Sequence, residues 1–113
     1  MAVDLQKVFN EELPASFSKF PDQAKSIGAK FQLNITGDGG GQWFIDASNS
    51  GPSVRQGQGP APDVTMIMAM QDFQMLYQNP QANGMSLFFS GRLKVLGNQM
   101  LAMKLNVLFA LGR

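Results

Sequence analysis

The chain of 113 residues contains no cysteine and no histidine. Without cysteine it forms no disulfide and offers no thiol nucleophile, which fits a reducing compartment, so we expect a cytoplasmic location. Without histidine it lacks the usual general base near neutral pH and the commonest metal ligand. The aspartates fall at turns, caps or strand positions and not as a pair. We therefore expect no enzymatic activity, no metal site and no cofactor.

Charge is also sparse, at 15% of residues with a formal net charge of +1. Lysine and arginine are scattered from Lys7 to Arg113, so the concentrated basic face that nucleic-acid binding needs is not expected. No apolar run reaches the roughly 18 residues of a membrane span, and the amphipathic N-terminus contains acids, unlike a secretory signal. The length predicts a single domain over residues 1–113. Because Met1 stands only a few residues before the first predicted element, we expect a free-standing protein.

The spacing of apolar residues predicts the secondary structure. Asp4 is typical of a helix N-cap, with Leu5, Val8, Phe9 and Leu13 at helical intervals behind it. Strict alternation of apolar and polar residues from Phe31 to Thr36 predicts a half-buried strand. The sequence predicts five strands, at residues 31–36, 43–47, around 54, 64–70 and 92–96. Further helices are predicted after Pro14 and Pro21 and over residues 72–77, 84–89 and 98–111.

This order of elements predicts an α+β fold. Four strands follow the first helices, and a final strand and helix close the domain. The expected architecture is a five-stranded mixed or antiparallel sheet with helices packed mainly on one face.

The glycine-rich segment Gly37–Gly41 permits two interpretations. It could cradle a phosphate, but a strand follows it and not the helix N-terminus that phosphate loops require. A hairpin turn between the first two strands is favoured.

Five segments of the chain, in order, resemble the sterol carrier protein-2 lipid-transfer family. They are Phe31-x-Leu33-x-Ile35, Trp43-Phe44-Ile45-Asp46, Val54 with Gly57, Asp63-x-Thr65-x-x-Met68 followed by Asp72-Phe73, and the run Leu87–Leu105. The last run carries two phenylalanines, Gly91, Arg92, Leu93-Lys94, Gly97-Asn98 and Ala102-x-Lys104-Leu105 in the family's succession. The chain departs from the pattern at Pro62, at Met70 and in the length of Asn79–Met85. The resemblance implies that Asp46 is structural and not a catalytic acid.

The resemblance further implies an apolar tunnel between sheet and helices that binds fatty acids, fatty acyl-CoA or sterols without catalysis. The alternative is a structural or interaction module of a larger lipid-metabolising assembly. The family also allows a peroxisomal location, although Leu111-Gly112-Arg113 is not the Ser-Lys-Leu type of signal. The residues expected to contact lipid are Leu33, Ile35, Ile45, Met66, Met68, Phe73, Leu76, Phe88, Phe89, Met100, Met103, Leu105 and Leu108.

The final helix is apolar on nearly every side, since only Lys104 and Asn106 are polar between Met100 and Leu111. Such a helix is either an ordinary core helix or the cover of an apolar site. The methionines on the fourth strand and on the helices favour the second interpretation, because thioethers adapt to ligands of different shape.

Three partner contacts are also expected. Phe44, Ile67 and Leu96 face away from the helices, and they are either a strip for a weak homodimer or another covering partner, or three scattered exposed side chains. Transient contact with a membrane surface would use the first helix or the C-terminal end. A lipid headgroup would meet Arg55, Arg92 or Lys104.

Overall fold

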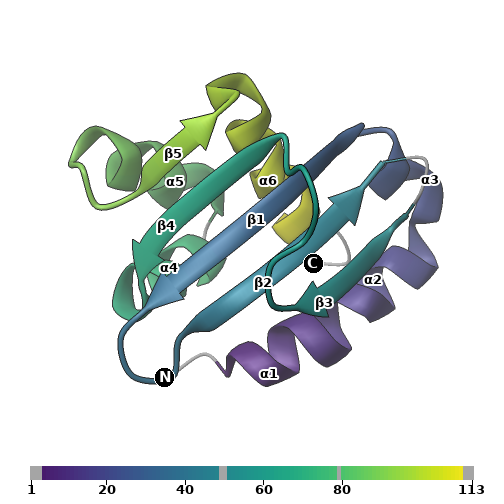
Figure 1. Cartoon of the computed structure of the whole chain (residues 1–113), viewed down its shortest axis with the longest axis horizontal. Coiled ribbons are helices and arrows are strands. Elements are labelled where there is room, and N and C mark those ends of the chain that lie inside the picture. Colours follow the sequence, from purple (N-terminus) through teal and green to yellow (C-terminus); the bar gives the residue numbers. More distant parts are fainter. Residues whose placement is uncertain (1–3, 49–50, 79, 111–113) are drawn as a thin grey trace.

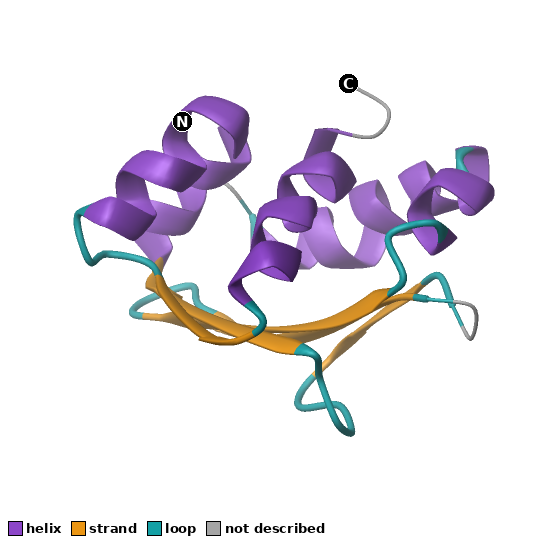
Figure 2. Ribbon diagram, turned by 90° about the horizontal axis from the view of Figure 1, so that it is seen from above, coloured by secondary structure: helices purple, strands orange, loops and turns teal. Residues whose placement is uncertain are grey.

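A computed structural model describes residues 4–48, 51–78 and 80–110. Its five strands are β1 (Ala29–Thr36), β2 (Gly41–Ala47), β3 (Ser53–Gln56), β4 (Val64–Ala69) and β5 (Lys94–Gly97). The helices are α1 (Leu5–Lys7), η1 (Val8–Glu12), α2 (Leu13–Lys19), α3 (Pro21–Lys25), α4 (Met70–Gln78), α5 (Pro80–Phe89) and α6 (Gln99–Ala110). The described helices all lie over one face of the sheet, which confirms the predicted α+β fold (Figures 1 and 2).

The sheet is mixed, with strand order β3-β2-β1-β4-β5. The central strand β1 pairs antiparallel with β2 and parallel with β4, so that Leu33 lies between Trp43 and Met66. Because side chains alternate along a strand, this register places one apolar row from each strand against the helices. The row from β1, β2 and β4 is buried: Phe31, Leu33, Ile35, Trp43, Ile45, Val64, Met66 and Met68.

The first helices form one continuous run with a wider turn inside it. Asp4 caps the run, since its Oδ1 accepts from the backbone N–H of Gln6 at 3.0 Å and of Lys7 at 3.4 Å. Over Val8–Glu12 the run is a π-helix, and the N–H of Leu13 donates to the carbonyl of Val8. Pro14 follows Leu13 and has no backbone N–H, so it cannot make the α-helical hydrogen bond to the carbonyl four residues earlier. This missing bond accounts for the wide turn.

A row of aromatic rings in contact ties this N-terminal run to the rest of the molecule. The ring centroids of Phe9 and Trp43 lie 4.8 Å apart, those of Phe9 and Phe73 5.6 Å, and those of Phe73 and Tyr77 5.9 Å. Tyr77 Oη also donates to Glu12 Oε1 at 2.8 Å. The aromatic row therefore joins η1, β2 and α4 into one unit.

The outer sheet face, opposite the helices, is partly covered by the chain itself. The connection from β3 to β4 crosses it, as Figure 1 shows. The buried Gln32 holds this connection, because its Nε2 donates to the carbonyl of Gly57 at 3.3 Å and its Oε1 accepts from the N–H of Gly59 at 3.0 Å. The backbone of Gly59 lies against the ring of Phe44, and the Arg55 guanidinium carbon lies 5.6 Å from the centre of the same ring.

The expectation that Phe44, Ile67 and Leu96 form one exposed strip is therefore wrong for Phe44. That side chain is only 5% exposed, because the β3–β4 connection covers it. Ile67 is half-buried, and Leu96 is exposed. A homodimer through all three residues would need the connection to move away.

Several element boundaries differ from the prediction. Met70 begins α4 and does not end β4, so Asp72 lies in the first turn of α4. Helix α5 begins at Pro80, earlier than the expected residue 84, and β5 begins at Lys94. The predicted end of the last helix at Leu111 and the C-terminal tripeptide lie outside the described residues.

Candidate functional site

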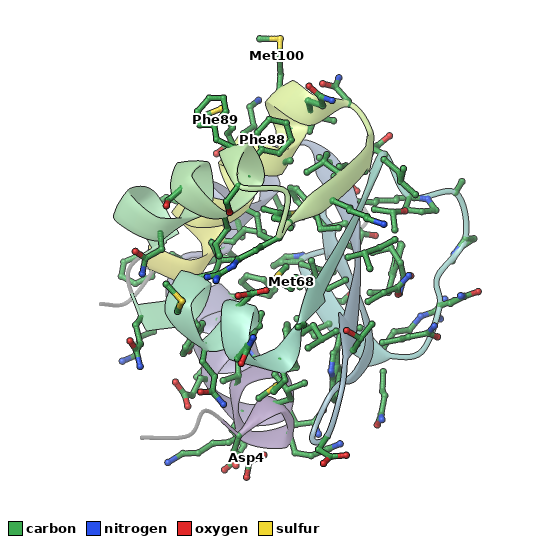
Figure 3. The ribbon with its side chains drawn as sticks, turned by 90° about the vertical axis from the view of Figure 1, so that its left-hand side faces the viewer. Asp4, Met68, Phe88, Phe89 and Met100 are labelled. Atoms are coloured by element: carbon green, nitrogen blue, oxygen red, sulfur yellow. The ribbon has the colours of Figure 1, made fainter. Side chains whose placement is uncertain are left out.

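The candidate site is an apolar layer between strands β1 and β4 and helices α4, α5 and α6. Every side chain in it is at most 7% exposed. Figure 3 shows Met68 between the sheet and the helices. The apolar layer consists of Leu33, Ile35, Met66 and Met68 from the sheet, and of Phe73, Leu76, Leu87, Ala102, Leu105 and Leu108 from the helices.

Helix α6 is positioned by its N-terminal cap. Asn98 Oδ1 accepts from the N–H of Met100 at 3.0 Å and of Leu101 at 3.4 Å, which satisfies two backbone donors that the helix itself cannot pair. From this start, Ala102, Leu105 and Leu108 recur at intervals of three and turn toward β1 and β4. Helix α5 packs mainly on α4 and α6.

The structure divides the thirteen residues that the sequence predicted for lipid contact. Nine are buried in the core, and Phe88 is half-buried against it. Phe89, Met100 and Met103 are instead 74%, 80% and 52% exposed. These three lie on the outside of α5 and α6. The prediction failed for them because a helix that is apolar all round gives no sequence signal for its inward face.

Sequence reasoning missed two members of the apolar layer, Leu87 and Ala102, which are both buried. Leu87 is followed by two phenylalanines, and nothing in the sequence distinguishes which of these three apolar side chains faces inward. In the structure its backbone is held at the end of α5, since the N–H groups of Arg92 and Leu93 both donate to its carbonyl. Ala102 lies three residues before Leu105, the helical interval that marks a shared face.

One ion pair lies beside the apolar layer. Arg92 Nη1 lies 3.8 Å from Asp72 Oδ1, and the Asp72 side chain is 7% exposed. Asp72 Oδ1 has no hydrogen-bond partner among the described residues. Of the three basic residues considered for a headgroup, Arg92 thus pairs with α4, Lys104 is exposed on α6, and Arg55 lies on the outer sheet face with Phe44.

The site is lined by apolar side chains. Among the described residues, no three acids come together in a way that could hold a metal ion. Asp46 accepts from the N–H of Ser48 at 3.0 Å and from its hydroxyl, so it closes the turn after β2. In the described part of the chain, no helix has the length and apolar character needed to cross a bilayer.

The chain is a small α+β domain. It consists of a mixed five-stranded sheet covered on one face by helices, with a layer of apolar side chains between them. The profile of the SCP-2 sterol transfer family matches residues 9–110. The chain belongs to this family, and the resemblance read from its motifs is confirmed.

Two curated relatives are human proteins. The chain is 35% identical over 88 residues to hydroxysteroid dehydrogenase-like protein 2, covering 77% of this chain and 21% of that protein. It is 38% identical over 84 residues to sterol carrier protein 2, covering 72% of this chain and 15% of that protein. The chain thus spans about a fifth or less of these relatives.

Solved structures share the whole fold. The sterol carrier protein domain 2 of Helicoverpa armigera matches with a TM-score of 0.73 and 25% identity, over 100% of this chain and 96% of that one. The sterol carrier protein-2 of Aedes aegypti, in complex with the C16 fatty acid palmitate, matches with a TM-score of 0.67 and 18% identity, over 97% of each chain.

Proposed function

We propose that this chain is a non-enzymatic carrier that holds fatty acids, fatty acyl-CoA or sterols in a tunnel formed within the apolar layer. The observation that carries the proposal is the layer itself, a continuous set of apolar side chains from two strands and three helices. Family membership and the palmitate complex of the Aedes aegypti protein support it. The two methionines from β4, Met66 and Met68, suit ligands of different shape.

The energetics favour reversible holding over permanent storage. Burying a methylene group yields about 0.8 kcal/mol, so an acyl chain of about sixteen carbons gains on the order of 12 kcal/mol before other terms. The loss of ligand freedom and the ordering of side chains remove several kcal/mol of this gain. A bilayer offers a similar gain per methylene, so transfer between membrane and protein is close to thermoneutral. The carrier can therefore both collect and release its ligand.

An empty tunnel would be costly for so small a domain. A void of about 300 Å³ costs roughly 7 kcal/mol at the slope measured for engineered cavities, which is comparable with the whole stability of a domain. We therefore expect the ligand-free chain to close over the site and to open around a ligand.

The test measures the affinity of the chain for a fluorescent fatty acid, and its displacement by unlabelled palmitate, in the wild type and in the variant Met68→Trp. In a carrier the larger ring takes space that the ligand needs, so affinity falls roughly tenfold or more while the fold persists. In a core that never opens, the wild-type chain binds no fluorescent fatty acid, and the same change only overpacks the layer at a cost of about 1–3 kcal/mol of stability. Met75→Trp, at an exposed methionine of α4, is the matched control and is expected to leave affinity unchanged.

A second candidate function is an interaction module in a larger lipid-metabolising assembly. It is favoured by one observation, that the curated relatives are far longer than the segment they share with this chain. If the purified chain binds no fluorescent fatty acid and its melting temperature does not change with palmitate, the carrier proposal fails and this alternative takes its place.

A further inference from the structure

An exposed apolar surface lies on the outside of α5 and α6. Met100, Met103 and Val107 are 80%, 52% and 50% exposed, and their spacing places them on one side of α6, opposite Ala102, Leu105 and Leu108. Phe89, at the end of α5, is 74% exposed, and Figure 3 shows it at the same end of the molecule as Met100. We call Phe89, Met100, Met103 and Val107 the α5–α6 patch.

The charge around this patch is mostly positive. All eight acidic residues of the chain lie at or before Asp72, whereas Arg92, Lys94, Lys104 and Arg113 follow it. The first three of these bases are exposed, and Lys104 lies on α6 between Met103 and Val107 in sequence. Of these, Arg92 forms an ion pair with Asp72, with 3.8 Å between its Nη1 and Asp72 Oδ1. Two acids also lie near these bases: Asp72, which faces Arg92, and the exposed Asp63, whose carbonyl accepts from the N–H of Asn98 just before α6. Bases therefore outnumber acids beside the α5–α6 patch.

We propose that the α5–α6 patch docks on the surface of an anionic lipid bilayer. Met, Phe and Val side chains enter the boundary between headgroups and acyl chains, and basic side chains beside them neutralise acidic headgroups. A second copy of the chain fits less well, because two such patches face to face would bring the bases beside them together.

The position of the patch connects docking with delivery. Its residues stand on α5 and α6, the helices that also cover the apolar layer, and the half-buried Phe88 packs on the core while its neighbour Phe89 is exposed. Their rings are in contact, with centroids 5.8 Å apart. Docking would hold these helices, and the apolar layer beneath them, against the bilayer. The role of docking in lipid delivery rests on the proposed carrier function.

The absence of cysteine permits a direct test, because a single introduced cysteine carries a label at one defined site. Met100→Cys is labelled with a polarity-sensitive fluorophore, and Ala15→Cys on α2, also exposed, is the matched site on the N-terminal run. The probe is vesicles of equimolar phosphatidylcholine and phosphatidylserine, with pure phosphatidylcholine for comparison. We expect a blue shift at residue 100 with anionic vesicles only. A shift at residue 15 and none at residue 100, or equal shifts with neutral vesicles, overturns the proposal.

Vesicle sedimentation of unlabelled variants supplies the magnitude. Met100→Ser with Val107→Ser is expected to lower binding to the anionic vesicles roughly tenfold, and Lys104→Glu by a similar factor. Lys19 is an exposed lysine of α2, and Lys19→Glu is the control. We expect it to change vesicle binding by no more than about twofold, because salt screens the charge of a side chain that lies away from the docked surface. Unchanged binding of the first two variants overturns the proposal, as does a wild-type dimer in sedimentation that the double substitution dissociates.

The two proposals fail separately. Wild-type protein that binds fluorescent fatty acid in solution but no anionic vesicle refutes docking and leaves the carrier function intact. Wild-type protein that binds anionic vesicles but no fatty acid refutes the carrier function and leaves docking intact.

Discussion

At Gly59 the backbone lies so close to the ring of Phe44 that a side chain has no room. An alanine there would push the β3–β4 connection off the outer face of the sheet. We expect Gly59→Ala to lower the free energy of unfolding by about 1–3 kcal/mol, measured by urea denaturation.

Gly41→Ala is the matched control for this substitution. A Cβ at Gly41 would meet nothing nearer than Trp43 Nε1 at 3.4 Å, which is an ordinary contact. We expect its effect to stay within about 0.5 kcal/mol. If the two alanine variants are equally stable, the β3–β4 connection does not lie against Phe44 as described.

Individual residues also mark the limit of sequence reasoning. Alternation identified Leu33 and Ile35 as inward-facing because a strand has two distinct faces. It could not identify Met100 and Met103 as outward-facing, because α6 is apolar on both sides. Nor could it show that Phe44 is covered, since the Gly- and Pro-rich connection has no periodicity that reveals its path.

Among the elements, α6 depends on its cap. Replacing Asn98 by alanine leaves the N–H groups of Met100 and Leu101 without their side-chain acceptor, and we expect a loss of about 1 kcal/mol in the free energy of unfolding. Asn98→Asp is the control, since a carboxylate accepts the same bonds and suits the positive end of the helix dipole. Equal losses in both variants would mean that the cap is not what stabilises α6.

Elements were predicted well where one signal dominated. Alternation predicted β1, an apolar run predicted β2, and capping chemistry predicted the N-cap at Asp4. The structure has all three, although each strand begins two residues earlier than predicted. The junction of β4 with α4 was misplaced because Met70 continues the apolar pattern of the strand while its backbone already belongs to the helix. Boundaries of this kind are set by packing between layers, which the local sequence does not contain.

At the scale of the whole molecule, stability should depend on ligand. If the carrier proposal holds, delipidated protein gains about 2.7 kcal/mol when free palmitate reaches about one hundred times its Kd, and its melting temperature rises accordingly. Differential scanning calorimetry measures the change. Octanoate at the same concentration should raise the melting temperature less, because each missing methylene removes about 0.8 kcal/mol of binding. Equal effects of the two acids would indicate surfactant action.

The aromatic row of Trp43, Phe9, Phe73 and Tyr77 makes the two halves of the helical layer unequal. Stiff aromatic rings packed against one another resist deformation, whereas the methionines and leucines under α6 change rotamer at low cost. If the carrier proposal holds, a longer or bulkier ligand would therefore be accommodated by displacement of α5 and α6, while η1 and β2 stay in place. Swelling would be one-sided, and it would occur beneath the same helices that carry the α5–α6 patch.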